Sequence, residues 1–243
     1  MGRAPALAIR LRAVSKAFGA QRALDRIDLD IPAGSYVAVM GANGAGKTTL
    51  LKVIAGLAVP TDGSVTIAGV EMKRAGPGLR ALVGFVGHES MLYPDLTARE
   101  NLTFHARLFG LTDPGGAVGQ ASRLLEVERI LDRPVRALSR GMRQRVTIAR
   151  ALLHDPAVIL FDEPFTGLDE AAALSLSGIL ERLNTPERVL LVTLHDVARA
   201  LSGPQRLVVL SSGRVVLDTA IHGSDEDVAA TYLGLLRSEA VRR

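Results

Sequence analysis

The chain has 243 residues, of which 48% are hydrophobic, with 24 Gly, 11 Pro and no Cys. A length of this order predicts one large domain or two small lobes, with enough core to fold without cross-links. The absence of Cys excludes a disulfide scaffold, a Cys-based zinc site and a thiol nucleophile. The 29 Lys and Arg against 25 Asp and Glu leave a net charge of only +4, and aromatic residues are 4%. Both values argue against nucleic acid as a partner.

No apolar stretch approaches the roughly 20 residues that a membrane-spanning helix needs. The most apolar runs, residues 157–161 and 189–194, are far shorter. Residues 1–12 mix Arg with alternating apolar residues, which is typical of a strand and not of a signal peptide. We therefore expect a cytoplasmic protein that reaches a membrane only through a partner.

Short apolar runs typical of strands alternate with helical patterns along the chain, which predicts an α/β fold with a mostly parallel sheet covered by helices. Residues 97–139 are instead helical almost throughout, with breaks at 110–116 and Pro134, and predict a helical insertion. Residues 224–236 open with Ser-Asp-Glu-Asp and predict a closing helix. The expected strands are 8–14, 36–40, 65–68, 83–86, 158–161, 189–193 and 207–210, and the clearest helices are 47–55 and 141–153.

A phosphate-binding loop follows the second of these strands. Its sequence, Gly-Ala-Asn-Gly-Ala-Gly-Lys-Thr-Thr, fits the pattern G-x-x-x-x-G-K-[ST]. Glycines let backbone N–H groups turn toward a polyphosphate, and the helix N-terminus adds partial positive charge. A glycine-rich turn with a chance Lys is the alternative, but a strand and a helix flank this one. Lys47 would neutralise the β- and γ-phosphates, and the Thr48 hydroxyl would ligate Mg²⁺. The loop predicts binding of ATP or GTP by Gly41, Ala42, Asn43, Gly44, Ala45, Gly46, Lys47, Thr48 and Thr49.

A second set of polar residues follows later strands. The apolar run 158–161 leads directly into Asp162 and Glu163. Because nucleotides bind at the carboxyl edge of a parallel sheet, we expect Asp162 to hold Mg²⁺ through water and Glu163 to polarise the attacking water. The strand 189–193 brings His195 to the same edge. A lone His is usually structural, but this position suits contact with a γ-phosphate.

The motif order is that of one known family. Leu-Ser-Arg-Gly-Met-Arg-Gln-Arg at 138–145 resembles the signature L-S-G-G-Q-x-Q-R of ATP-binding cassette (ABC) ATPases, and the likeness covers nearly the whole chain. The resemblance implies a single P-loop domain, with a core at about 1–87 and 140–243, an N-terminal antiparallel β part and a helical subdomain at about 88–139. It implies ATP as substrate and Mg²⁺ as cofactor. The further positions that match nucleotide contacts are Phe18, which would stack on adenine, Ser139, Arg140, Gly141 and Met142 of the signature, and Asp169 of the D-loop, which is Thr-Gly-Leu-Asp at 166–169.

The signature also implies a dimer. In this family the signature helix faces the γ-phosphate that the opposing subunit holds, and Ser139 with the N–H groups around Gly141 would make such an anion site. The resemblance therefore implies a homodimer around two ATP molecules, with separately encoded membrane permease subunits as partners. The expected activity is ATP hydrolysis coupled to transport, at the cytoplasmic face of the membrane.

Three positions depart from the family pattern. His88 follows the strand ending near Val86, where the family normally has a Gln that ligates Mg²⁺, and imidazole is a poorer ligand for this ion than oxygen. We keep His88 as a candidate metal ligand. Arg140 and Met142 stand where the family has Gly and Gln, and Arg140 would add a cation near the γ-phosphate of the opposing subunit or near that subunit itself.

These departures resemble one ABC group in particular, the ATP-binding subunits of the haem exporter in cytochrome c maturation. The match combines His88, Leu-Thr-Ala-x-Glu-Asn-Leu at 96–102 and Ser-Arg-Gly-Met at 139–142. Because the chain has no Cys-x-x-Cys-His motif, haem recognition would lie in the partners. The alternatives are another exporter ATPase, for drugs, polysaccharides or lipids, and a soluble ABC ATPase acting on nucleic acid or ribosomes. A metabolic kinase would have no use for the signature.

Overall fold

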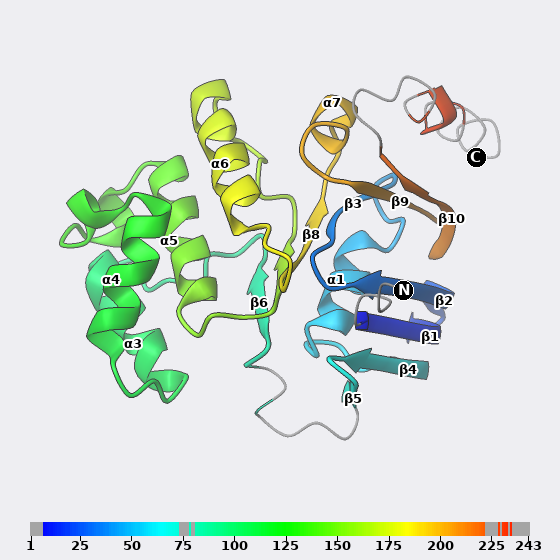
Figure 1. Ribbon diagram of the computed structural model, residues 1–243, viewed down its shortest axis with the longest axis horizontal. Helices are drawn as coiled ribbons and strands as arrows, with labels where there is room; N and C mark the ends of the chain where they lie inside the picture. The colour runs from blue at the N-terminus through cyan, green and yellow to red at the C-terminus, as the bar shows by residue number, and fades with distance from the viewer. Residues whose placement is uncertain are drawn as a thin grey trace, which may run out of the picture.

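The computed structural model of the chain describes residues 7–72, 78, 81–221, 228, 230–232 and 234. Its strands form two sheets, with helices between them and beside them (Figure 1). The helix expected at 224–236 lies mostly outside the described residues. Among the described helices, none has the length and apolar composition that crossing a bilayer demands.

The first sheet is antiparallel and holds the amino-terminal strands. Its order is β2-β1-β4-β5. The strands expected at 8–14 and 65–68 are present as β1 and β4. Two further strands, β2 and the two-residue β5, were not predicted. In β2 the signal is alternation, since Ile27, Leu29 and Ile31 are buried between exposed or half-buried neighbours. The bounds are β1 Leu7–Phe18, β2 Gln21–Pro32, β4 Asp62–Ile67 and β5 Val70–Glu71.

The second sheet carries the functional strand ends. Its order is β10-β9-β3-β8-β7-β6, and every pairing is parallel except that of the edge strand β10 with β9. All residues of β3, β7 and β8 are buried, as expected where helices cover both faces. The mostly parallel sheet is confirmed. The bounds are β3 Tyr36–Met40, β6 Val83–Val86, β7 Val158–Phe161, β8 Val189–Thr193, β9 Arg206–Ser211 and β10 Arg214–Ala220.

Helices cover the two faces of this sheet. Helix α1 (Lys47–Ile54) packs between the two sheets, with Leu50, Leu51 and Ile54 in their shared core. The opposite face packs against α5 (Arg140–Leu152) and α6 (Glu170–Leu183). The short α7 (Val197–Ala200) follows β8.

The expected helical insertion is present and lies at the end of the molecule away from β10 (Figure 1). It contains α3 (Ala98–Leu108), α4 (Pro114–Leu125) and two short 3₁₀ turns, Glu128–Ile130 and Val135–Ala137. The expected break at 110–116 is wrong in its second half, because α4 begins at Pro114. Asp113 caps this helix by accepting a hydrogen bond from the Gly116 N–H at 2.9 Å, and Pro suits the first helical position.

Candidate active site

The phosphate loop joins β3 to α1 and is held by close backbone contacts. Gly41 and Gly46 have φ of 146° and 106°. A Cβ at Gly41 would lie 2.2 Å from the Leu210 carbonyl oxygen, and one at Gly46 would lie 2.5 Å from that of Ala23. Both positions therefore require glycine. Gly46 is also the N-cap of α1, and no side chain caps this helix.

Lys47 is buried inside the loop. Its Nζ donates to the carbonyl oxygens of Gly41 at 2.8 Å and Ala42 at 3.2 Å. Burial lowers the pKa of Lys47, while the nearby carboxylates of Glu163 and Asp162 act in the opposite direction. The ammonium is thus fixed on the loop backbone, where a phosphate would meet it.

Asp162 lies at the end of β7 and is 4% exposed. Its Oδ1 accepts hydrogen bonds from Thr48 Oγ1 at 3.1 Å and Thr193 Oγ1 at 3.0 Å. Thr48 and Asp162 therefore bring two hard oxygen donors together beside the phosphate loop, which fits Mg²⁺. Over the part of the chain that the structure describes, no group of three or more His, Cys, Asp or Glu could hold a metal. The remaining ligands of such an ion would be phosphate and water oxygens.

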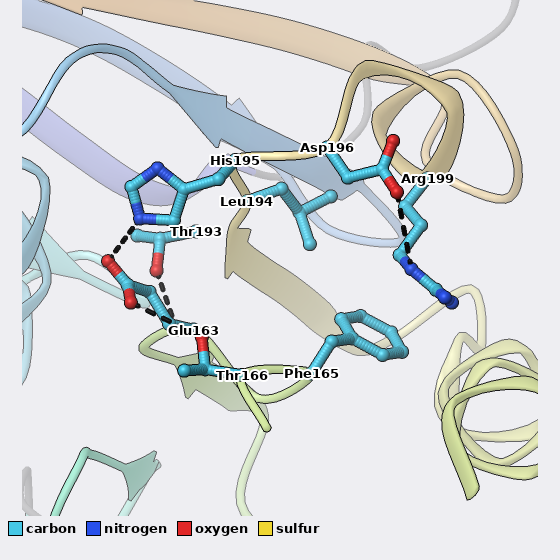
Figure 2. Close-up of a pocket in the computed structure, with 8 residues that line it drawn as sticks. All are labelled: Glu163, Phe165, Thr166, Thr193, Leu194, His195, Asp196 and Arg199. Atoms are coloured by element: carbon cyan, nitrogen blue, oxygen red, sulfur yellow. Dashed lines mark hydrogen bonds and ion pairs between the residues drawn. The ribbon is translucent and has the colours of Figure 1, made fainter. Parts of the chain in front are cut away.

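Glu163 follows Asp162 in the left-handed conformation, with φ of 54°. Its N–H donates to Thr193 Oγ1 at 2.7 Å, and its Oε1 lies 2.5 Å from His195 Nε2 (Figure 2). Burial alone would raise the pKa of Glu163. The hydrogen bond from His195 and the charges of His195, His88 and Lys47 outweigh burial, so this pKa lies below its usual value. An ionised carboxylate only accepts hydrogen bonds, so Nε2 carries the proton.

Thr193 belongs to the candidate site but was not predicted from the sequence. Its hydroxyl is fully buried at the end of β8 and contacts both Asp162 and the backbone of Glu163. A hydroxyl at the carboxyl end of an otherwise aliphatic strand was the available signal. The sequence brings His195 to the same edge two residues later, as expected.

His88 lies on the other side of Glu163. Its Nε2 is 3.7 Å from Glu163 Oε2. The recorded partner of this imidazole is thus the carboxylate that faces His195, and not the Thr48–Asp162 pair. Its role as a metal ligand stays a prediction.

In the part of the chain that the structure describes, three cavities have Glu163 in common as a lining residue. One, of about 290 Å³, lies over the phosphate loop and is lined by Phe18, Lys47 and Thr48, among others. A second, about 260 Å³, is bounded by His88, Arg140 and Thr166. The third lies toward α7, where Arg199 packs over the Phe165 ring with its Cζ 5.1 Å from the centroid (Figure 2). The Phe18 ring is 55% exposed beside the first cavity, which is where the sequence placed the adenine contact.

The signature residues lie elsewhere. Ser139 caps α5 by accepting from Met142 N–H at 3.3 Å, and Asp169 likewise caps α6 through the Ala172 N–H at 2.8 Å. Ser139, Gly141, Met142 and Asp169 are not among the described residues that line the phosphate-loop cavity. Within one chain, Glu163 lines the phosphate-loop cavity, whereas the start of α5 reaches the neighbouring cavity, through Arg140.

A P-loop nucleotide hydrolase is the class that this fold and site define. A sequence model of the ABC transporter family matches residues 24–166. ABC transporter ATP-binding protein NatA of Bacillus subtilis is 34% identical over 91% of this chain and 92% of its own length. The chain belongs to the ABC transporter family and is an ABC ATPase that binds ATP.

The solved structures agree. The ATP-binding cassette MJ0796, in a dimeric post-hydrolysis state bound to ADP and Pi, matches with a TM-score of 0.79 and 29% identity. The match covers 88% of this chain and 99% of that one. The ABC ATPase fold expected from the sequence is confirmed.

Relatives differ in length and in direction of transport. The chain spans 60% of an ATP-binding protein of Brucella abortus that is 36% identical over 85% of this chain. A Nod factor export ATP-binding protein of Cupriavidus metallidurans is 36% identical, over 88% of this chain and 71% of that protein. The maltose/maltodextrin import protein MalK of Yersinia pestis is 37% identical, over 85% of this chain and 57% of that protein.

Proposed function

We propose that this chain is the ATP-hydrolysing subunit of a membrane transporter and works as a homodimer closed around two ATP molecules. One observation carries the proposal: the chain joins a phosphate loop to Glu163 and His195, yet its signature residues line no part of that cavity. A second copy would supply the start of α5 across the nucleotide. The dimeric state named for MJ0796 supports this arrangement.

The residues divide the chemistry between binding and hydrolysis. Lys47 and the loop N–H groups bind the phosphates, and Phe18 stacks on the adenine. Thr48 and Asp162 would hold Mg²⁺, which neutralises phosphate charge when bound. Glu163, ionised and oriented by His195, accepts a hydrogen bond from the attacking water and polarises it.

A Glu163→Gln variant tests the dimer. It keeps the shape of the side chain but cannot act as a base, so ATP should bind without being hydrolysed and hold two subunits together. Light scattering with ATP and Mg²⁺ should give twice the mass of one chain. A Lys47→Ala, Glu163→Gln double variant is the control and should stay monomeric. A monomeric Glu163→Gln protein with bound nucleotide would contradict the proposal.

The partner surface is an exposed apolar group on α3 and on the loop before it. Its members, 40–67% exposed, are Met91, Tyr93, Phe104, Leu108 and Phe109. The rings of Tyr93 and Phe104 pack edge to face, with their centroids 5.5 Å apart. We assign this surface, within a helical subdomain at about 88–139, to a permease subunit at the cytoplasmic face of the membrane.

Substitutions on that surface should separate coupling from hydrolysis. Leu108→Asp should abolish co-purification with the integral membrane subunit and leave basal ATPase activity within about twofold. Leu174→Asp, on the similarly exposed α6 residue, is the matched control and should retain the partner. Retention by both variants would exclude this surface.

As substrate we propose haem for cytochrome c maturation, supported by His88 with the Ser-Arg-Gly-Met signature. The second candidate is another exported molecule, supported by the likeness to a Nod factor export protein. Deleting the gene should abolish haem-stained c-type cytochromes, and the Lys47→Ala variant should not restore them. Normal c-type cytochromes in the deletion strain would exclude haem and leave the second candidate.

A further inference from the structure

Arg140 is the first residue of α5 and stands where the family signature has Gly. Its side chain lies over the turn between β7 and α6. Nη2 donates to the Thr166 carbonyl oxygen at 2.7 Å. The sequence expectation placed this cation near a phosphate or the opposing subunit; in the single chain it is bonded to its own D-loop.

The guanidinium of Arg140 packs against Gly167. A Cβ at Gly167 would lie 2.3 Å from Arg140 Cζ and 2.5 and 2.6 Å from its two terminal nitrogens. Gly167 also has a φ of 72°. The guanidinium plane therefore lies directly against the Gly167 backbone, and any larger residue there would displace it.

The same turn touches the candidate catalytic carboxylate. Thr166 N–H donates to the Glu163 carbonyl at 3.2 Å, and Thr166 Oγ1 donates to Glu163 Oε2 at 3.4 Å (Figure 2). Glu163 itself sits at a positive φ, which a non-glycine residue keeps only when its surroundings hold it there. Arg140 is thus linked through one intervening residue, Thr166, to the Glu163 carboxylate, the group proposed to orient the attacking water.

We propose that Arg140 is a positioning residue, which clamps the Thr166–Gly167 turn to the start of α5 and so fixes the Glu163 carboxylate within the same chain. The proposal rests on the role proposed for Glu163. It assigns to the guanidinium a contact with the D-loop of its own chain instead of a contact with the nucleotide of the other subunit. The clamp acts on the hydrolytic step and not on ATP binding.

The first test is the kinetics of Arg140→Ala and Arg140→Lys. We expect Arg140→Ala to lower kcat about tenfold while KM for ATP stays within about twofold, since the loss lies in the chemical step. Arg140→Lys should recover part of kcat, because its ammonium can still donate to the Thr166 carbonyl. Arg143→Ala removes an equal charge from the next turn of α5 and should change kcat less than about twofold.

The second test is a double-mutant cycle with Gly167→Ala. If the clamp is the shared cause, Gly167→Ala should lower kcat strongly in the wild type and far less when Arg140 is already Ala. If the kcat of the double variant falls by the product of the two single-variant losses, the two residues act independently, and the proposal is overturned. If Gly167→Ala fails to fold, the Arg140→Ala and Arg140→Lys pair, which keep Gly167, decide alone.

A third measurement separates this proposal from the dimer proposal. In the Glu163→Gln background, Arg140→Ala should still form the ATP-bound dimer. Loss of the dimer in that double variant alone would mean that Arg140 contacts the opposing subunit, and would overturn the clamp. Loss of the dimer in Glu163→Gln itself would instead refute the dimer proposal, while the kinetics of the clamp could still be measured.

Discussion

The phosphate-loop region and the start of α5 are built differently. Around the loop, Lys47, Asp162 and Thr193 are buried and hydrogen-bonded to other groups of the same chain. At the start of α5, Ser139 and Met142 are exposed. Buried groups with internal partners are fixed before a ligand arrives, whereas an exposed helix end is available to one. The first region is assembled within a single chain, whereas the second would be completed by the second subunit of the proposed dimer.

The largest effect should come from Lys47→Ala. Removing the buried ammonium takes away the only charge on the loop and should lower ATPase activity about 100-fold or more. Binding of a fluorescent ATP analogue should fall in parallel. Lys52→Ala, at the end of the same helix, is the control. Unchanged nucleotide binding in Lys47→Ala would contradict the claim that the phosphate loop of a single chain binds the nucleotide through Lys47.

Thr193→Ala should come next. It leaves the part-buried Glu163 N–H without its acceptor and removes one of the two hydroxyl donors to Asp162 Oδ1, which costs about 1–3 kcal/mol. We expect kcat to fall about tenfold and the thermal midpoint to drop. Thr193→Ser, which keeps the hydroxyl, should restore both. Wild-type kcat in Thr193→Ala would show that the buried network does not hold Glu163.

Ser139→Ala tests the exposed region. It should weaken the helix cap by about 1 kcal/mol and abolish the ATP-bound dimer in the Glu163→Gln background, while a single chain still binds nucleotide. Thr97→Ala removes the capping residue of α3 and controls for stability. An intact dimer would mean that the start of α5 does not complete the site.

The smallest effect concerns acid stability beside the phosphate loop. Hydrogen bonds from Arg214 and Arg22 hold the pKa of Asp25 below its usual value. A carboxylate with a lowered folded pKa adds stability above its unfolded pKa, about 3.9, and loses it as pH falls through the folded value. Asp25→Asn should therefore be less stable than wild type at pH 7, and the gap should close below about pH 4.

Thermal unfolding across this pH range measures the difference. Glu187→Gln, an exposed substitution of the same charge, should show no such gap. A gap between wild type and Asp25→Asn that widens toward low pH would have the wrong sign for this ion pair.

Several parts of the site were predictable because they depend on local pattern. The apolar strands β7 and β8 end shortly before Asp162 and His195, and this pattern predicts polar side chains at the edge of a sheet. The glycine spacing before Lys47 is typical of phosphate-binding loops and therefore predicts one. The alternation in β2 carried a strand signal of the same local kind.

Other features depend on packing between distant segments. A Thr such as Thr193 is common in strands, so its contacts with Asp162 and Glu163 follow only once β7 and β8 are neighbours. The direction of the Arg140 side chain depends on the turn at Gly167, which is remote in sequence. The ion pair of Asp25 with Arg214 joins β2 to β10 across most of the chain.

Helix α1 has Gly46 as its N-cap and therefore no capping side chain, so its first N–H groups lack a protein acceptor of that kind. Nucleotide phosphates can serve as that acceptor only in the folded chain. Nucleotide concentration is therefore a stability variable: a ligand at 100 times its Kd adds about 2.7 kcal/mol to the free energy of unfolding. Purified without nucleotide, the protein should unfold at a lower temperature, and ATP should protect it against heat and proteases.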